Sequence, residues 1–190
     1  MQKRRLKPLR PCRDAHILGT PVLGGFSCAK EYRDAYDSAA AALTDSALRL
    51  HWMNRLQCMG YTAAALVHPR SAVRGNATVG EGAFVNIGAV VGAGTCIGRG
   101  CMLCPGCVVA GECIIKDGAN LCCGAHVENG CRIGYRARIG AGAVVGAGVR
   151  VGDDAVVCPG SVVDRDVRDG MVVAGSPACV TGNAAFDWKR

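Results

Sequence analysis

Histidine and aromatic side chains are scarce in this chain, which has four His, three Phe, two Trp and four Tyr among 190 residues. So few histidines, without the paired Cys and His spacing of a structural zinc site, argue against a metal centre. Few aromatics leave no row of stacking platforms for nucleic acid, and the 22 Lys and Arg residues are dispersed along the chain. We therefore expect neither a metal ion nor a nucleic-acid partner.

The chain also lacks a long apolar segment. No stretch approaches the roughly 18 apolar residues that a membrane-spanning helix needs. The first residues, MQKRRLKPLRPC, are basic but contain no apolar core of a signal peptide. These two observations predict a cytoplasmic protein without a membrane span.

What the chain has instead is an unbroken period of six. From Val67 to Val163 every sixth residue is Val, Ile or Leu, although these three types make up only 40 of the 190 residues. The residue two positions before each of them is nearly always small. Glycine directly follows the aliphatic residue in several hexads, namely at Gly80, Gly92, Gly98, Gly134, Gly140, Gly146 and Gly152.

A short fixed period predicts a solenoid, whose units bury their apolar sides only by stacking on one another. Three hexads would make one coil, with the aliphatic residue inside and tight corners between short strands. Residues eighteen apart then stack, so one vertical file should contain Val85, Leu103, Leu121 and Ile139. The glycines after the aliphatic residues should relieve corners that need unusual backbone angles.

The thirteen cysteines receive a structural interpretation first. Four of them occupy the small inward column, where a thiol packs as a slightly enlarged alanine: Cys101, Cys107, Cys113 and Cys131. Cys104 and Cys122 fall on one corner of adjacent coils. A metal pair is conceivable there, but no histidine lies at ligand spacing, and a reducing compartment disfavours disulfides.

Residues 1–66 lack the period of six. We expect a loose arm at 1–16 and a truncated α/β fragment at 17–66, followed by the solenoid at 67–180 and a tail at 181–190. The fragment should contain a strand and turn at 17–25, a buried strand at 39–43 and another strand at 62–67. Asp45 or Ser46 should cap a helix that ends near Gly60. The face expected to be buried consists of Leu48, Trp52, Leu56 and Met59.

In its period of six the chain resembles the hexapeptide-repeat acyltransferases with a left-handed parallel β-helix. Within them it is similar to the sialic acid O-acetyltransferase and sugar-nucleotide N-acetyltransferase group, through ILGTPVLG at 17–24, LVHP at 66–69, GAHVENGCRIG at 124–134 and AGSPA at 174–178. The resemblance implies a mainly β fold, a homotrimer with active sites between subunits, and acetyl-CoA as donor. It also implies a sugar or sugar-nucleotide acceptor in surface-glycan biosynthesis, with N- and O-transfer both open.

The resemblance also implies a catalytic histidine oriented by a neighbouring carboxylate. Here Glu128 supplies the carboxylate, but Asn129 occupies the position of the base, and Arg138 occupies that of a second family histidine near the thioester. His126 is the candidate replacement base, because it precedes the inward Val127 and should point outward. The alternative is a surface histidine without a role.

The three other histidines are weaker candidates. His68 precedes a proline and is expected to be structural, whereas His16 and His51 have no catalytic context. Arg49 matches a family arginine near the nucleotide pocket, or else is a solvated helix residue. No glycine-rich phosphate loop of the family's α/β domain precedes Ile17, which weakens the expectation of a nucleotide-sugar acceptor.

Donor binding is expected along the groove between neighbouring helices. The residues assigned to the pantetheine arm are Gly140, Ala141, Gly146, Cys158, Pro159 and Gly160, although a purely conformational role would also explain the glycines. The net charge of +7 would attract the phosphates of this donor.

Three functions remain open. The first is an acetyl-CoA-dependent acetyltransferase. The second is a catalytically degenerate trimer that acts as a binding or scaffold protein. The third, a β-helix metal enzyme of the carbonic anhydrase type, is disfavoured because only His68 and His126 lie within the repeat.

Overall fold

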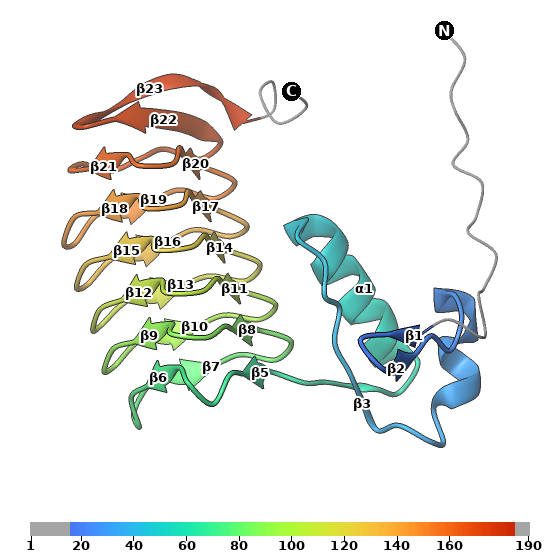
Figure 1. The fold of residues 1–190 in the computed structure, drawn as a ribbon. Helices are drawn as coiled ribbons and strands as arrows, with labels where there is room; N and C mark the ends of the chain where they lie inside the picture. Colours follow the sequence, from blue (N-terminus) through green and yellow to red (C-terminus); the bar gives the residue numbers. More distant parts are fainter. Residues whose placement is uncertain (1–15, 185–190) are drawn as a thin grey trace, which may run out of the picture.

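The computed structural model describes residues 16–184. Residues 1–15 and 185–190 lie outside the described part, and so do most of the predicted arm (1–16) and of the predicted tail (181–190). In the described part the chain forms a three-sided solenoid of about six turns, preceded by a short α/β segment (Figure 1). Among its helices, none is both long enough and apolar enough to cross a membrane.

The solenoid has three faces, and successive strands of the chain lie on successive faces, so that each face is a parallel sheet of every third strand up to β21. The first face contains β5 (Leu66–Val67), β8 (Phe84–Val85), β11 (Met102–Leu103), β14 (Asn120–Leu121), β17 (Arg138–Ile139), β20 (Val156–Val157), β22 (Met171–Gly175) and the antiparallel β23 (Ala178–Asn183). The second face contains β6 (Ala72–Val73), β9 (Val90–Val91), β12 (Val108–Val109), β15 (His126–Val127), β18 (Val144–Val145) and β21 (Val162–Val163). The third face contains β7 (Thr78–Val79), β10 (Cys96–Ile97), β13 (Ile114–Ile115), β16 (Arg132–Ile133) and β19 (Arg150–Val151). The first corner is the turn that leads from the first face to the second. The second corner leads from the second face to the third, and the third corner leads from the third face back to the first.

The predicted vertical file is confirmed. Leu103 pairs in register with Val85 on one side and Leu121 on the other, and Leu121 pairs with Ile139. All four side chains are completely buried. One aliphatic residue from each hexad therefore fills the interior, and the coils stack at a spacing of about 4.8 Å.

The predicted reason for the glycines after the aliphatic residues is wrong. These glycines are absent from the positions with positive φ. A Cβ on Gly98 would instead lie 2.6 Å from the amide nitrogen of Asp117 in the next coil. Close stacking of the coils, rather than an unusual backbone angle, therefore requires glycine here. The positive φ values of 54–72° occur two residues later, at Gly82, Gly88, Gly94, Gly100, Gly106, Glu112, Gly118, Gly124, Gly130, Arg136, Gly142, Gly148, Asp154 and Gly160.

The core position of the four inward cysteines is confirmed, because each is completely buried. The thiols of Cys101, Cys113 and Cys131 donate to backbone carbonyl oxygens of the next coil at 3.0–3.1 Å. Burial raises the pKa of Cys101 and Cys107 to about 12, so both stay protonated at neutral pH.

The N-terminal segment is less regular than predicted. β1 (His16–Ile17) pairs with β2 (Thr20–Pro21) as a small hairpin, and a 3-10 helix that was not predicted, η1, spans Phe26–Tyr32. β3 (Ser38–Ala39) is shorter than the predicted strand at 39–43 and pairs in parallel with β4 (Thr62–Ala63). The predicted strand at 62–67 divides in two, because Leu66 and Val67 already belong to the first coil.

Helix α1 (Ser46–Cys58) begins and ends as predicted, but its buried face matches the predicted one only in part. Leu56 is buried as expected, and Trp52 and Met59 are half-buried against the same apolar cluster. The Asp45 carboxylate accepts the amide of Leu48 at 2.8 Å, and Gly60 has a φ of 93°. Leu48 is 51% exposed, whereas the buried residues are Arg49, Leu50, Met53 and Leu56. The burial of Leu50 and Met53 was missed because α1 packs on the third corner, where these two side chains occupy space that Cβ atoms on Gly82, Gly100 and Gly118 would take.

Candidate functional site

His126 and Glu128 lie together on one coil, at the second face and second corner. Nε2 of His126 is 3.2 Å from Oε1 of Glu128, and both side chains are about two-fifths exposed. His126 stands in the outer row of the second face, between Val108 and Val144. Glu128 therefore orients the imidazole through Nε2, and Nδ1 is the ring nitrogen that faces away from this carboxylate.

Asn129, at the position of the family base, has a structural role. Its Oδ1 accepts the backbone amide of Gly111 in the preceding coil at 2.9 Å. Asp117 and Asp153 accept the amides of Arg99 and Tyr135, eighteen residues earlier, in the same way. Asn129 thus links two adjacent coils at a corner, as these aspartates do. Its carboxamide cannot act as a general base at neutral pH.

The residues predicted to bind the donor divide between two corners. Gly140, Ala141, Cys158, Pro159 and Gly160 stack at the first corner, where the Gly160 amide donates to the Ala141 carbonyl oxygen at 2.9 Å. A Cβ on Gly140 would lie 2.5 Å from the nitrogen of Pro159.

Gly146 lies apart from this group. It follows β18 at the second corner, so within one subunit it lies on a different corner from the other five residues. Residues 140 and 146 are one hexad apart, so they take equivalent places on successive corners rather than on the same one.

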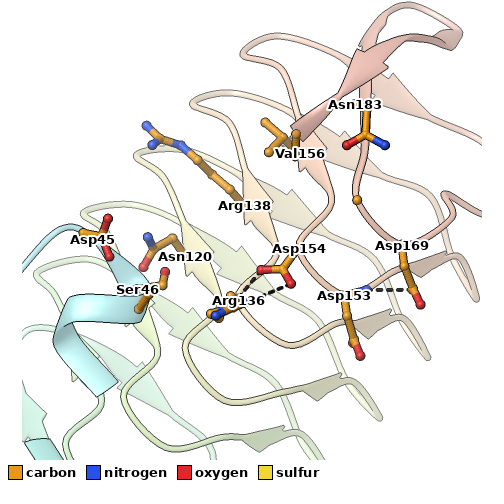
Figure 2. A pocket seen from close by; sticks show the side chains of 13 residues that line it. Asp45, Ser46, Asn120, Arg136, Arg138, Asp153, Asp154, Val156, Asp169 and Asn183 are labelled. Carbon is orange, nitrogen blue, oxygen red and sulfur yellow. Dashed lines mark hydrogen bonds and ion pairs between the residues drawn. The ribbon is translucent and has the colours of Figure 1, made fainter. Parts of the chain in front are cut away.

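A pocket of about 710 Å³ opens between the first face and the N-terminal end of α1 (Figure 2). Arg138 is the single predicted site residue among those that line it, and it lies between Asn120 and Val156 in the outer row of the first face. The others lining it are Asp45, Ser46, Ala47, Arg136, Asp153, Asp154, Asp169, Gly170, Asn183 and Ala184. Within one subunit, Arg138 is on a different face from His126.

Paired charges hold the wall of this pocket. Arg136 binds Asp154 through two hydrogen bonds of 2.7 Å, and this partner raises the pKa of Arg136 (Figure 2). Lys116 lies 3.1 Å from Asp153, and the pKa of Asp153 is lowered, first by the Tyr135 amide. Cations, carboxylates and amides therefore converge on one cavity, and such polar groups fix the orientation of a ligand.

The sequence contained a signal for this wall. Asn120, Arg138 and Val156 are eighteen residues apart, as are Arg136 and Asp154, so the period of six already places each set in one file. The contribution of α1 could not be read in this way, because the period of six does not extend to the helix.

Arg49 is neither solvated nor a pocket residue. It is completely buried and donates to the carbonyl oxygens of Leu43 and Gly100 at 2.6 and 2.7 Å, and to Oδ1 of Asn120 at 2.6 Å. Burial lowers its pKa, but a guanidinium remains charged at neutral pH. Arg49 therefore fixes α1 against the coils that form the pocket.

His68, the histidine expected to be structural, makes a local hydrogen bond. Nδ1 of His68 accepts the amide of Arg70 at 3.0 Å, within the first corner. Across residues 16–184, no group of three or more His, Cys, Asp or Glu side chains is arranged to hold a metal ion.

No protein-family model matches the sequence, and no curated protein sequence matches it either. Solved structures do. A histidine-to-asparagine variant of perosamine N-acetyltransferase from Caulobacter crescentus, in complex with CoA and GDP-perosamine, is 30% identical with a TM-score of 0.86. The match covers 90% of this chain and 82% of that one.

Two further structures are similar. The acetyltransferase domain of PglB from Neisseria gonorrhoeae, in complex with acetyl coenzyme A, is 28% identical with a TM-score of 0.86, over 88% of this chain and 82% of that chain. WeeI from Acinetobacter baumannii shares the fold at 24% identity, with a TM-score of 0.79 over 90% of this chain and 82% of that chain.

Proposed function

The chain belongs to the hexapeptide-repeat, left-handed β-helix acetyltransferases related to sugar-nucleotide N-acetyltransferases, and from this membership we propose that it transfers acetyl from acetyl-CoA to a sugar or sugar nucleotide. The relatives support the choice of both substrates. The Caulobacter enzyme holds CoA and a GDP-linked sugar, and the Neisseria domain holds acetyl coenzyme A.

The observation that carries the proposal is the pair formed by His126 and Glu128, 3.2 Å apart. Glu128 holds Nε2, so Nδ1 accepts the proton of the acceptor amine or hydroxyl as that group attacks the thioester carbonyl carbon. The carbon–sulfur bond then breaks, and the CoA thiolate leaves and takes up a proton. Asn129 holds the corner that carries Glu128.

The acceptor is proposed to enter the pocket between the first face and α1, and the donor to lie along the first corner. His126 is on the second face, so pocket and base meet only when a second copy of the chain packs alongside. The homotrimer implied by the family resemblance supplies this arrangement. The outer row of Val90, Val108, Val144 and Val162 on the second face supports such packing, because these apolar side chains are otherwise half-buried or exposed.

A second candidate function has a specific observation in its favour. Both family histidine positions are changed, to Asn129 and Arg138, and Asn129 is used in corner bonding. The Caulobacter relative holds CoA and GDP-perosamine with one of its histidines replaced by asparagine. A catalytically degenerate trimer that binds these ligands without turnover is therefore the alternative.

We expect His126→Ala to lower kcat/KM for acetyl transfer about a hundredfold or more, because a positioned base contributes that much to proton transfer. Thiol release from acetyl-CoA with amino sugars and their nucleotides measures the rate, and calorimetry measures donor binding, which should not change. His51→Ala, an exposed histidine on α1, is the matched control. Acetyl-CoA binding by the wild type without thiol release for any acceptor would instead establish the scaffold.

A further inference from the structure

The third corner departs from glycine on two adjacent coils, and both departures are in the pocket between the first face and α1. On the other coils the residue with positive φ at this corner is Gly82, Gly100, Gly118 or Gly170. Between Gly118 and Gly170 it is Arg136 and then Asp154, each with a φ of 54°. Both residues line the pocket. A side chain is unfavourable in this conformation, and such residues tend to occur at functional sites.

Asp154 holds Arg136 at the wall of the pocket. Nε and Nη2 of Arg136 donate to the two carboxylate oxygens of Asp154, both at 2.7 Å (Figure 2). The guanidinium also lies over the Tyr135 ring, 4.8 Å from its centre. A guanidinium is the usual group for binding a phosphate through two parallel hydrogen bonds. In Arg136 these two donors are already directed at a carboxylate, which also compensates the positive charge.

A second element that could bind an anion is likewise occupied by a carboxylate. The N-terminal end of α1 lines the pocket, and amides at helix N-termini readily bind phosphates. Here the carboxylate of Asp45 accepts the Leu48 amide at 2.8 Å. Asp45 therefore places a negative charge at the end of α1 where a phosphate would otherwise be favoured.

The charges around the pocket are negative in sum. Among the described residues, the charged side chains that line it are Asp45, Asp153, Asp154, Asp169, Arg136 and Arg138. Lys116 adds one more positive charge from outside the lining, 3.1 Å from Asp153. Carboxylates remain in excess, so the pocket disfavours a phosphate and favours an amine.

On the basis of the proposed function, we propose that Asp154 determines which acceptor the pocket takes. By binding Arg136 it excludes phosphorylated sugars, and the acceptor is an amino sugar that carries no phosphate group. Specificity of this kind depends on repulsion of the wrong ligand as well as on attraction of the right one.

The test replaces Asp154 by the residue that other coils have at this place. Asp154→Gly suits the positive φ and leaves the guanidinium of Arg136 without its carboxylate. Calorimetry with glucosamine and with glucosamine 1-phosphate measures the two affinities. We expect the wild type to bind glucosamine about tenfold more tightly than its phosphate, and Asp154→Gly to bind the phosphate about tenfold more tightly than the wild type does.

Two further variants show whether this gain acts through Arg136. The double variant Arg136→Gly, Asp154→Gly should lose the gain, because the cation is absent. Glu112→Gly is the matched control: Glu112 also has a positive φ, of 58°, but lies at the second corner and does not line the pocket. It should bind both sugars as the wild type does.

Three results would overturn the proposal. They are equal affinity of the wild type for both sugars, an unchanged preference in Asp154→Gly, and no binding of either sugar to the wild type.

These binding measurements do not require turnover, so the proposal and the proposed function can fail separately. Thiol release from acetyl-CoA with a nucleotide sugar but not with glucosamine would refute the phosphate-free acceptor and leave acetyl transfer in place. The expected binding preference without thiol release for any acceptor would refute acetyl transfer and leave the specificity of the pocket in place.

Discussion

At the scale of single residues, Arg49 joins the two parts of the chain. Its guanidinium is completely buried, and it donates hydrogen bonds to backbone carbonyl oxygens and to the side-chain oxygens of Ser46 and Asn120. Asn120 in turn donates to the Thr44 carbonyl oxygen at 3.0 Å. The planar donors of arginine match this spread of acceptors, which a single ammonium group would not.

We expect Arg49→Ala to lower the free energy of unfolding by about 3 kcal/mol, because it leaves several buried acceptors without a donor. Arg49→Lys should restore only part of this loss. Urea denaturation measures both, and Arg74→Ala, at an exposed arginine of the second corner, should stay within about 0.5 kcal/mol of the wild type. Equal effects of the Arg49 and Arg74 substitutions would show that the buried bonds do not stabilise the fold.

At the scale of the coil, glycine serves two purposes at different places in one turn. Directly after the inward aliphatic residue it lets the coils approach, as at Gly134, where a Cβ would lie 2.5 Å from the amide nitrogen of Asp153. Two residues later it supplies a positive φ, as at Gly106, where a Cβ would meet nothing within 4 Å. Arg136 and Asp154 adopt this second conformation, so a side chain is tolerated there.

The two kinds of glycine should respond differently to alanine. Gly134→Ala should lower the free energy of unfolding by about 3 kcal/mol, because the added methyl group must displace the backbone of the next coil. Gly106→Ala should lower the free energy of unfolding by only about 1–2 kcal/mol, because alanine is penalised there by the positive φ alone. Denaturation midpoints of the two variants measure the difference, and a larger loss at Gly106 would contradict the assignment of close approach to Gly134.

At the scale of the whole molecule, the proposed site is incomplete in one subunit. The pocket that contains Arg138 and the pair of His126 and Glu128 open on different faces of the solenoid. The second face presents valines in the same outer row as His126. Catalysis and assembly should therefore be lost together when this row is made polar.

We expect light scattering to give three chains of 19.6 kDa for the wild type. Val144→Glu should dissociate this assembly and lower acetyl transfer about a hundredfold, since a buried unpaired charge disrupts the interface and the base leaves the pocket. Ala35→Glu adds the same charge at an exposed site of the N-terminal segment and should remain trimeric. A wild-type mass of a lone subunit would remove the basis for a shared site.

The sequence by itself determined the solenoid, the file of Val85, Leu103, Leu121 and Ile139, and the burial of the inward cysteines. These follow from a local period that every coil repeats, so neighbouring coils must stack the same residues. The ends of α1 were also readable, because a capping carboxylate and a terminal glycine act within one turn of the helix.

Only the tertiary structure decided which face of α1 is buried and what the pocket contains. A buried arginine contradicts the apolar pattern by which helix faces are predicted, and it is stable here because carbonyls of two coils converge on it. The pocket joins Asp45 to Asn120 and Arg138, far apart in sequence and related by no repeat. Their proximity arises when Leu50 and Met53 pack where the third corner has no Cβ atoms.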